Sequence, residues 1–342
     1  MRIWLGCPHA AVRWGLAASL TVVCAAIPFR LSAQQAPLLL VSTAWPPFTN
    51  EPGQPRFALD LVEEAFKRIG LTATTTIVEP SRFATAVLST MYDGSAAAWK
   101  DAERERLLVF SQPYLENRLV LIGRRGEDVS ATGLGALRGK RIALVEGYAY
   151  GDGITTSGVI PVRSSSEQDG LSQVLASKAD YVLMDEVVVQ YILEHYPNEA
   201  KTKLSVGSTP LVKRSLYLAV RRSRPDAAAI VERFNAQLRG MIADRTYHRL
   251  LHVAWILADV DGDGVTEFVP KSDLSGKEPP KQAYSLFSSD ALDTKSSASG
   301  PRFYVGGHIY TDWAAVPNRY KYPPPNVPDS DSRTATLFTF KW

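Results

Sequence analysis

The chain has 342 residues, of which 45% are hydrophobic and 21% are charged, as is ordinary for a soluble globular protein of one large or two smaller domains. Its formal net charge of +3 is small and argues against a nucleic-acid-binding surface. The sequence contains no phosphate-binding P-loop, no His-Glu-x-x-His zinc motif and no Gly-x-Ser-x-Gly nucleophile turn. Composition and motifs therefore argue against these classes of enzyme and against a nucleic-acid-binding protein.

The N-terminal segment is typical of a secretory signal peptide. Arg2 and Arg13 precede an apolar run over residues 14–27, and Leu31-Ser-Ala33 fits a cleavage site after Ala33. An uncleaved membrane anchor is the alternative, but a bilayer requires about 20 apolar residues, more than this run offers. Cleavage of residues 1–33 removes three arginines, no acid and both cysteines, which leaves a net charge of zero. We therefore expect a soluble periplasmic protein without thiol or disulfide, and no lipid anchor.

The first third of the chain alternates between strand and helix patterns. Residues 38–42 and 72–78 are short apolar or β-branched runs, and both are predicted strands. Residues 57–69 carry apolar side chains at helical spacing and end before Gly70, and a second helix begins near Glu79. This order predicts an α/β fold with a parallel sheet, in which ligands bind beyond the carboxyl ends of the strands.

A run of small residues, Ser95–Ala98, is followed by a polar turn that carries Arg104 and Arg106. An arginine beside exposed backbone suits a carboxylate ligand, because its planar guanidinium donates two parallel hydrogen bonds. The alternative is that both arginines are solvated partners of the glutamates between and before them. Further along, residues 119–123, 179–186 and 215–220 are predicted strands, residues 171–178 a helix, and 225–251 a long helical segment.

The segment Glu103-Arg104 to Phe110-Ser-Gln-Pro-Tyr114, after Asp93-Gly94, resembles the ligand site of the family-3 extracellular solute-binding proteins for polar amino acids. The resemblance extends over roughly residues 38–255. It implies a two-lobed periplasmic binding protein of type II that closes on its ligand about a hinge. Lobe 1 would comprise 34–122 and 214–255, and lobe 2 would comprise 123–213.

The same resemblance implies roles for single residues. Arg104 would bind the ligand carboxylate, Asp185 its ammonium, and Trp45 its apolar face with Phe48 packed behind. Without the resemblance, an acid after a strand is more often a turn or helix cap. The sequence departs from the family where Ala96 and Ala97 replace serines and where Tyr148-Ala-Tyr150 replaces small hydroxyl residues. The predicted ligand-binding residues are Trp45, Phe48, Ala97, Trp99, Arg104, Gly147, Tyr148 and Asp185.

Residues 256–342 form an extension outside this resemblance. Its segment 259–267 has carboxylates at its first, third, fifth and ninth positions and a glycine at the sixth, as calcium loops require. Pro270 stands where an EF-hand has its last glutamate, and the segment resembles the loops of FG-GAP repeats more closely. A solvated acidic turn is the alternative. The predicted calcium ligands are Asp259, Asp261, Asp263, Val265 through its carbonyl, and Glu267.

These patterns lead to one expected function and two alternatives. We expect a monomeric periplasmic protein that captures an amino acid or related carboxylate and passes it to an ABC permease or a membrane sensor. It needs no cofactor, and calcium would bind only in the extension. A dehydratase-like enzyme on the same fold is one alternative, with Glu146 or Glu186 as the acid. A sensing or assembly protein that contacts its partner through the extension is the other.

Overall fold

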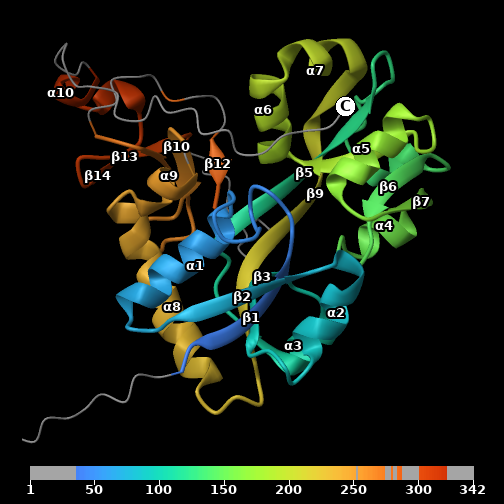
Figure 1. The fold of residues 1–342 in the computed structure, drawn as a ribbon. Helices are drawn as coiled ribbons and strands as arrows, with labels where there is room; N and C mark the ends of the chain where they lie inside the picture. The colour runs from blue at the N-terminus through green and yellow to red at the C-terminus, as the bar shows by residue number, and fades with distance from the viewer. Residues whose placement is uncertain (1–35, 252, 274–278, 280–282, 287–299, 322–342) are drawn as a thin grey trace, which may run out of the picture. The chain divides into compact units, whose positions relative to one another are not determined.

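The computed structural model describes residues 36–251, 253–273, 279, 283–286 and 300–321 (Figure 1). All of them belong to one compact unit, Ala36–Trp342. The predicted signal peptide, residues 1–33, lies outside the described residues and stays a prediction. Among the residues that the structure describes, no helix is both long and apolar enough to cross a bilayer.

The main sheet has the strand order β2-β1-β3-β9-β5-β8-β6-β7, and β4 pairs in addition with β9 (Figure 1). β1 pairs in parallel with β2 and β3, and β6 with β7 and β8, as the alternating strand and helix patterns predict. The strands are β1 (Leu38–Thr43), β2 (Ala73–Val78), β3 (Gly94–Trp99), β4 (Leu108–Phe110), β5 (Leu115–Arg124), β6 (Arg141–Val145), β7 (Ile160–Ser164), β8 (Tyr181–Asp185) and β9 (Leu204–Arg221).

The helices that pack on this sheet bury the apolar stripe that their sequences predict. In α1, for example, Phe57, Leu61 and Ala65 recur every four residues and are all buried. The helices are α1 (Phe57–Arg68), α2 (Pro80–Leu88), α3 (Ala102–Leu107), α4 (Asp152–Thr156), α5 (Glu167–Leu175), α6 (Glu186–His195), α7 (Pro197–Lys203), α8 (Ala227–Ala243), α9 (Thr246–Leu251) and α10 (Asn318–Lys321), with short 3₁₀ turns at Leu134–Leu137 and Trp313–Ala315.

The two long strands β5 and β9 join two groups of elements. They pair antiparallel from Leu115 opposite Leu216 to Arg124 opposite Leu204. We call β1–β4 with α1–α3, α8 and α9 lobe 1, and β6–β8 with α4–α7 lobe 2. The predicted fold class, a two-lobed α/β protein with discontinuous lobes, is confirmed. Both crossovers lie in these strands, which contain the predicted boundaries at 122–123 and 213–214.

Two local predictions are wrong. The segment around Arg104, predicted as a turn, is helix α3, because the Asp101 side chain accepts a hydrogen bond from the Arg104 N–H and caps it. The single helical segment 225–251 is two helices, separated at Arg245, whose φ of 66° ends the first.

The extension forms a second sheet with the order β12-β10-β11-β13-β14. Ile256, Val269 and Leu286 have no exposed surface and belong to the same hydrophobic core as lobe 1. His248 Nε2 of α9 also lies 2.9 Å from the Val269 carbonyl oxygen, so this part of the extension is joined to lobe 1. The hairpin of β13 and β14 forms one edge of the sheet. The strands are β10 (Trp255–Ala258), β11 (Glu267–Pro270), β12 (Tyr284–Ser285), β13 (Arg302–Val305) and β14 (His308–Tyr310).

Candidate functional site

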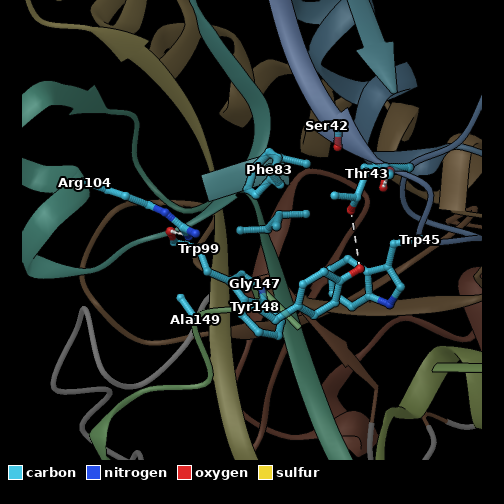
Figure 2. A pocket seen from close by; sticks show the side chains of 12 residues that line it. Ser42, Thr43, Trp45, Phe83, Trp99, Arg104, Gly147, Tyr148 and Ala149 are labelled. Carbon is cyan, nitrogen blue, oxygen red and sulfur yellow. Dashed lines mark hydrogen bonds between the residues drawn. The ribbon is translucent and has the colours of Figure 1, made fainter. Parts of the chain in front are cut away.

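A small cavity of about 30 Å³ lies where the carboxyl ends of β1 and β3 meet the loop after β6. A cavity needs roughly 10–15 Å³ for each water, so this one holds about two waters and no amino acid. The lobes therefore have to separate before a ligand can enter. The cavity is lined by Ser42, Thr43, Trp45, Thr49, Phe83, Ala97, Trp99, Arg104, Gly147, Tyr148, Ala149 and Leu216 (Figure 2).

Most of the residues predicted from the sequence come together here. Six of the eight line the cavity, and Phe48 lies directly behind the indole of Trp45, with their ring centroids 4.7 Å apart. Asp185 is the exception, because it does not line the cavity. The six lining residues are Trp45, Ala97, Trp99, Arg104, Gly147 and Tyr148.

Aromatic side chains from both lobes meet at the cavity. The ring centroids of Trp45, Trp99 and Tyr148 are 5.5 Å apart in each of the three pairs, and all three pairs meet edge to face. Tyr150 packs against Trp99 at 5.6 Å, and its hydroxyl accepts a hydrogen bond from the Val145 N–H. Figure 2 shows the Tyr148 hydroxyl directed at Thr43, and the two oxygens are 3.4 Å apart. Such a cluster can stack on planar groups and attract cations.

Arg104 forms the lobe 1 wall of the cavity. The residue is only 5% exposed, and its Nη1 donates to the Trp99 carbonyl at 2.8 Å. Its Nε lies 3.2 Å from an Asp101 carboxylate oxygen, and its guanidinium lies over the Phe83 ring at 5.5 Å. Nη2 has no hydrogen-bond partner among the described residues. Burial lowers the Arg104 pKa from its ordinary value, yet the group stays charged at neutral pH.

Gly147 brings the loop of lobe 2 into close contact with lobe 1. Its φ of 82° lies in the left-handed region, which favours glycine. A Cβ at this position would lie 2.4 Å from the carbonyl oxygen of Pro80, at the start of α2. Only a glycine therefore allows the lobes to approach this closely.

Asp185 caps helix α6 and forms hydrogen bonds with strand β5, one of the two strands that join the lobes. Its carboxylate accepts hydrogen bonds from the Val187 N–H at 2.9 Å, the Asn117 Nδ2 at 3.1 Å and the Arg118 N–H at 3.2 Å. This is the helix-cap reading that the residue type alone favoured. Burial raises the pKa of Asp185 to about 7.

A second buried acid, Glu167, was not predicted from the sequence. Its Oε1 accepts a hydrogen bond from Trp45 Nε1 at 2.9 Å, across the boundary between the lobes. Burial, with repulsion from Asp185, raises the pKa of Glu167 to about 8. The glutamate follows Ser166, which caps α5 through its side chain, so the local pattern indicates a helix start and not a contact with Trp45.

The lining residues that sequence reasoning missed are small or apolar. Thr43 follows the predicted strand that leads to Trp45, and its position at a strand end was a usable signal. Phe83 and Leu216 belong to apolar runs, which carry no sign of a ligand site before the lobes are assembled. The missed lining residues are Ser42, Thr43, Thr49, Phe83, Ala149 and Leu216.

Three acidic side chains of the predicted calcium loop, residues 259–267, form ion pairs with Arg302 of β13. Nη1 of Arg302 lies 2.6 Å from Asp263, its Nη2 3.1 Å from Asp261 and its Nε 2.9 Å from Glu267. One carboxylate oxygen from each of Asp259, Asp261 and Glu267 lies within 4.8 Å of the other two, which fits a hard cation. The Arg302 guanidinium supplies the positive charge in this arrangement.

The comparison with protein-family models shows which family the chain belongs to. The sequence model of the bacterial extracellular solute-binding proteins, family 3, matches residues 39–257. The ABC transporter arginine-binding protein 1 of Escherichia coli (strain K12) is 26% identical over 237 residues, which cover 68% of this chain and 95% of that protein.

Solved structures share the fold over part of this chain. An ancestral arginine-binding protein bound to arginine superposes with a TM-score of 0.54 at 21% identity, over 64% of this chain and 98% of that one. A histidine kinase sensor domain with similarity to periplasmic binding proteins gives 0.55 at 20% identity, over 64% and 95%.

Proposed function

The chain belongs to the bacterial extracellular solute-binding proteins of family 3, and we propose that it binds an amino acid or related carboxylate between its lobes. This family consists of binding proteins, which confirms the expectation that the chain is not an enzyme. The observation that carries the proposal is Arg104, a buried arginine in the wall of the cavity with one nitrogen unused among the described residues.

The chemistry of Arg104 suits a carboxylate. A buried guanidinium whose charge is only partly neutralised by the half-exposed Asp101 retains strong attraction for an anion. Its hydrogen bond to the Trp99 carbonyl fixes the plane of the guanidinium, so little conformational freedom is lost when a ligand binds. Opening of the lobes would expose this group to a ligand, and closure would remove water from the contact.

The aromatic cluster points to a ligand with a planar or cationic side chain. The rings of Trp45, Trp99 and Tyr148 offer faces for stacking once the lobes separate. The Escherichia coli relative is named as an arginine-binding protein. L-arginine is therefore the first ligand to test, and we propose that its carboxylate pairs with Arg104 while its side chain lies among the rings.

Delivery to an ABC permease in the periplasm is the role that we propose for the bound ligand, in line with the Escherichia coli relative. Sensing is the second candidate, because a histidine kinase sensor domain has the same fold. A monomer suffices for either role. Calcium in the extension is a separate proposal, and binding between the lobes does not depend on it.

Isothermal titration calorimetry with three matched ligands tests the proposal. L-arginine carries every group, 5-guanidinovalerate lacks the amino group, and agmatine lacks the carboxylate. We expect L-arginine to bind and agmatine to bind at least about 30-fold more weakly, since a buried arginine loses its charged partner. The proposal is wrong if agmatine binds as well as L-arginine, or if neither the twenty common amino acids nor their deaminated carboxylate analogues bind.

A further inference from the structure

We infer that Glu167 is a positioning residue of the ligand site, which fixes the indole of Trp45 from the opposite lobe when the lobes close. The inference rests on the proposed function, because it assigns Trp45 to the ligand-facing wall. Glu167 itself does not line the cavity. It acts on a ligand only through the side chain that it holds.

The contact joins the two lobes directly. Trp45 lies just beyond β1 of lobe 1, and Glu167 is the first residue of α5 in lobe 2. Trp45 Nε1 donates to Glu167 Oε1 at 2.9 Å, and the two residues are 7% and 9% exposed. Their numbers differ by 122, and the bond forms only when the lobes meet. Trp45 lines the cavity at the same time, and the hydrogen bond restricts the orientation of its ring.

The surroundings of Glu167 give it no cationic partner among the described residues. Asp185 on β8 contributes a repulsive charge and a backbone N–H, and the loop after β6 contributes Tyr148 and Tyr150. Trp45 is the neighbour from lobe 1. At the start of a helix an ionised glutamate is ordinarily favoured in water by the helix dipole. Burying this side chain therefore has a free-energy cost that a structural role in α5 alone does not explain.

Closure of the lobes consequently takes up a proton. In the closed arrangement burial raises the pKa of Glu167 to about 8, whereas the exposed side chain of an open cleft has the ordinary value of about 4.5. The closed state thus binds more protons than the open state between these two pKa values. The stabilisation of the closed state by this proton uptake is complete below about pH 4.5 and is lost as the pH rises toward 8. The equilibrium constant for closure then falls by up to about tenfold per pH unit.

Substitutions separate the hydrogen bond from the charge. Glu167→Gln keeps an oxygen that accepts from Trp45 Nε1 but cannot titrate. Glu167→Ala removes both. Glu146→Gln is the matched control, because Glu146 belongs to the same lobe, is exposed, and pairs with Arg163 at 3.3 Å on the surface.

The test measures L-arginine affinity by calorimetry from pH 5.5 to 8.5. We expect the affinity of the wild type and Glu146→Gln to fall steeply with pH, while Glu167→Gln stays flat and binds more tightly than the wild type above pH 6, because only the glutamate has to take up a proton. Glu167→Ala should bind about 10- to 100-fold more weakly than Glu167→Gln at pH 6. In a Trp45→Phe background the difference between the alanine and glutamine variants should be less than threefold, because the donor is already absent. A pH slope of Glu167→Gln equal to that of the wild type, or an equal alanine effect in both backgrounds, overturns the inference.

A ligand-free measurement keeps this inference distinct from the proposed function. Small-angle X-ray scattering should show the radius of gyration of the wild type increasing between pH 5.5 and 8.5 as the lobes open, with Glu167→Gln unchanged. If L-arginine fails to bind but this contrast is present, the proposed ligand is wrong and the role of Glu167 stands. If both proteins open over the same pH range, the role of Glu167 is wrong whatever the ligand.

Discussion

Replacing Arg104 with lysine tests the ligand site at the residue on which the assignment depends most. Arg104 Nη1 and Nε are held by the Trp99 carbonyl and Asp101, and the group is buried in the cavity wall. Lysine keeps the positive charge but offers a single nitrogen, so it cannot bind a carboxylate through two parallel hydrogen bonds while retaining these contacts. The substitution therefore removes the planar set of hydrogen-bond donors and keeps the positive charge.

The expected loss in binding free energy is about 2–5 kcal/mol, the cost of disrupting a desolvated charge pair. This corresponds to a dissociation constant raised by about 30-fold to several-thousand-fold. Arg106→Lys is the control, because Arg106 lies two residues away in the same helix α3 and is exposed. Calorimetry with L-arginine measures both variants, and thermal unfolding checks that both remain folded. Equal losses in the two folded variants would refute the assignment of Arg104.

Three further predictions concern other parts of the molecule. Gly147→Ala should weaken ligand binding more than tenfold, because the new Cβ meets the Pro80 carbonyl oxygen when the lobes close. Gly151 also has a positive φ but no backbone atom near its Cβ position, so Gly151→Ala should not weaken binding to this extent, and equal losses in calorimetry would contradict the prediction. Millimolar calcium should raise the midpoint of thermal unfolding, and should raise it more in Arg302→Gln than in the wild type, because the ion then replaces the guanidinium. Melting curves that superimpose with and without chelator would exclude calcium binding. Burial lowers the pKa of His248 to about 4, so the unfolded chain binds more protons than the folded chain between pH 4 and 6.5. Urea unfolding should therefore show the free energy of unfolding falling by up to about 3 kcal/mol from pH 7 to pH 4, and this fall should be smaller in His248→Gln.

Hydrophobic periodicity predicted most of the α/β framework. The strands around Leu40 and Val182 and the helix around Leu61 lie within a residue or two of their predicted bounds, because each buries a side-chain pattern with a single period. The break at Arg245 was missed, since it depends on a backbone conformation that neighbouring apolar residues do not reveal.

The candidate site was predictable only where one residue carries a distinctive chemistry. Arg104 and Trp45 could be placed in the cavity from the family resemblance and their residue types. Glu167 could not, because its contact with Trp45 spans 122 residues and exists only in the assembled lobes. Arg302 was missed for the same reason, since the cation that neutralises the acidic loop comes from a strand 35 residues beyond Glu267.

Native mass spectrometry of the freshly purified protein tests the central claim most directly, because it needs no prior choice of ligand. The wild type should carry a small molecule whose mass is that of an amino acid or related carboxylate. Arg104→Ala, purified in parallel, should lose that molecule while Arg106→Ala retains it. A co-purified molecule without a carboxylate, or one that Arg104→Ala retains in full, would contradict a ligand site built on Arg104.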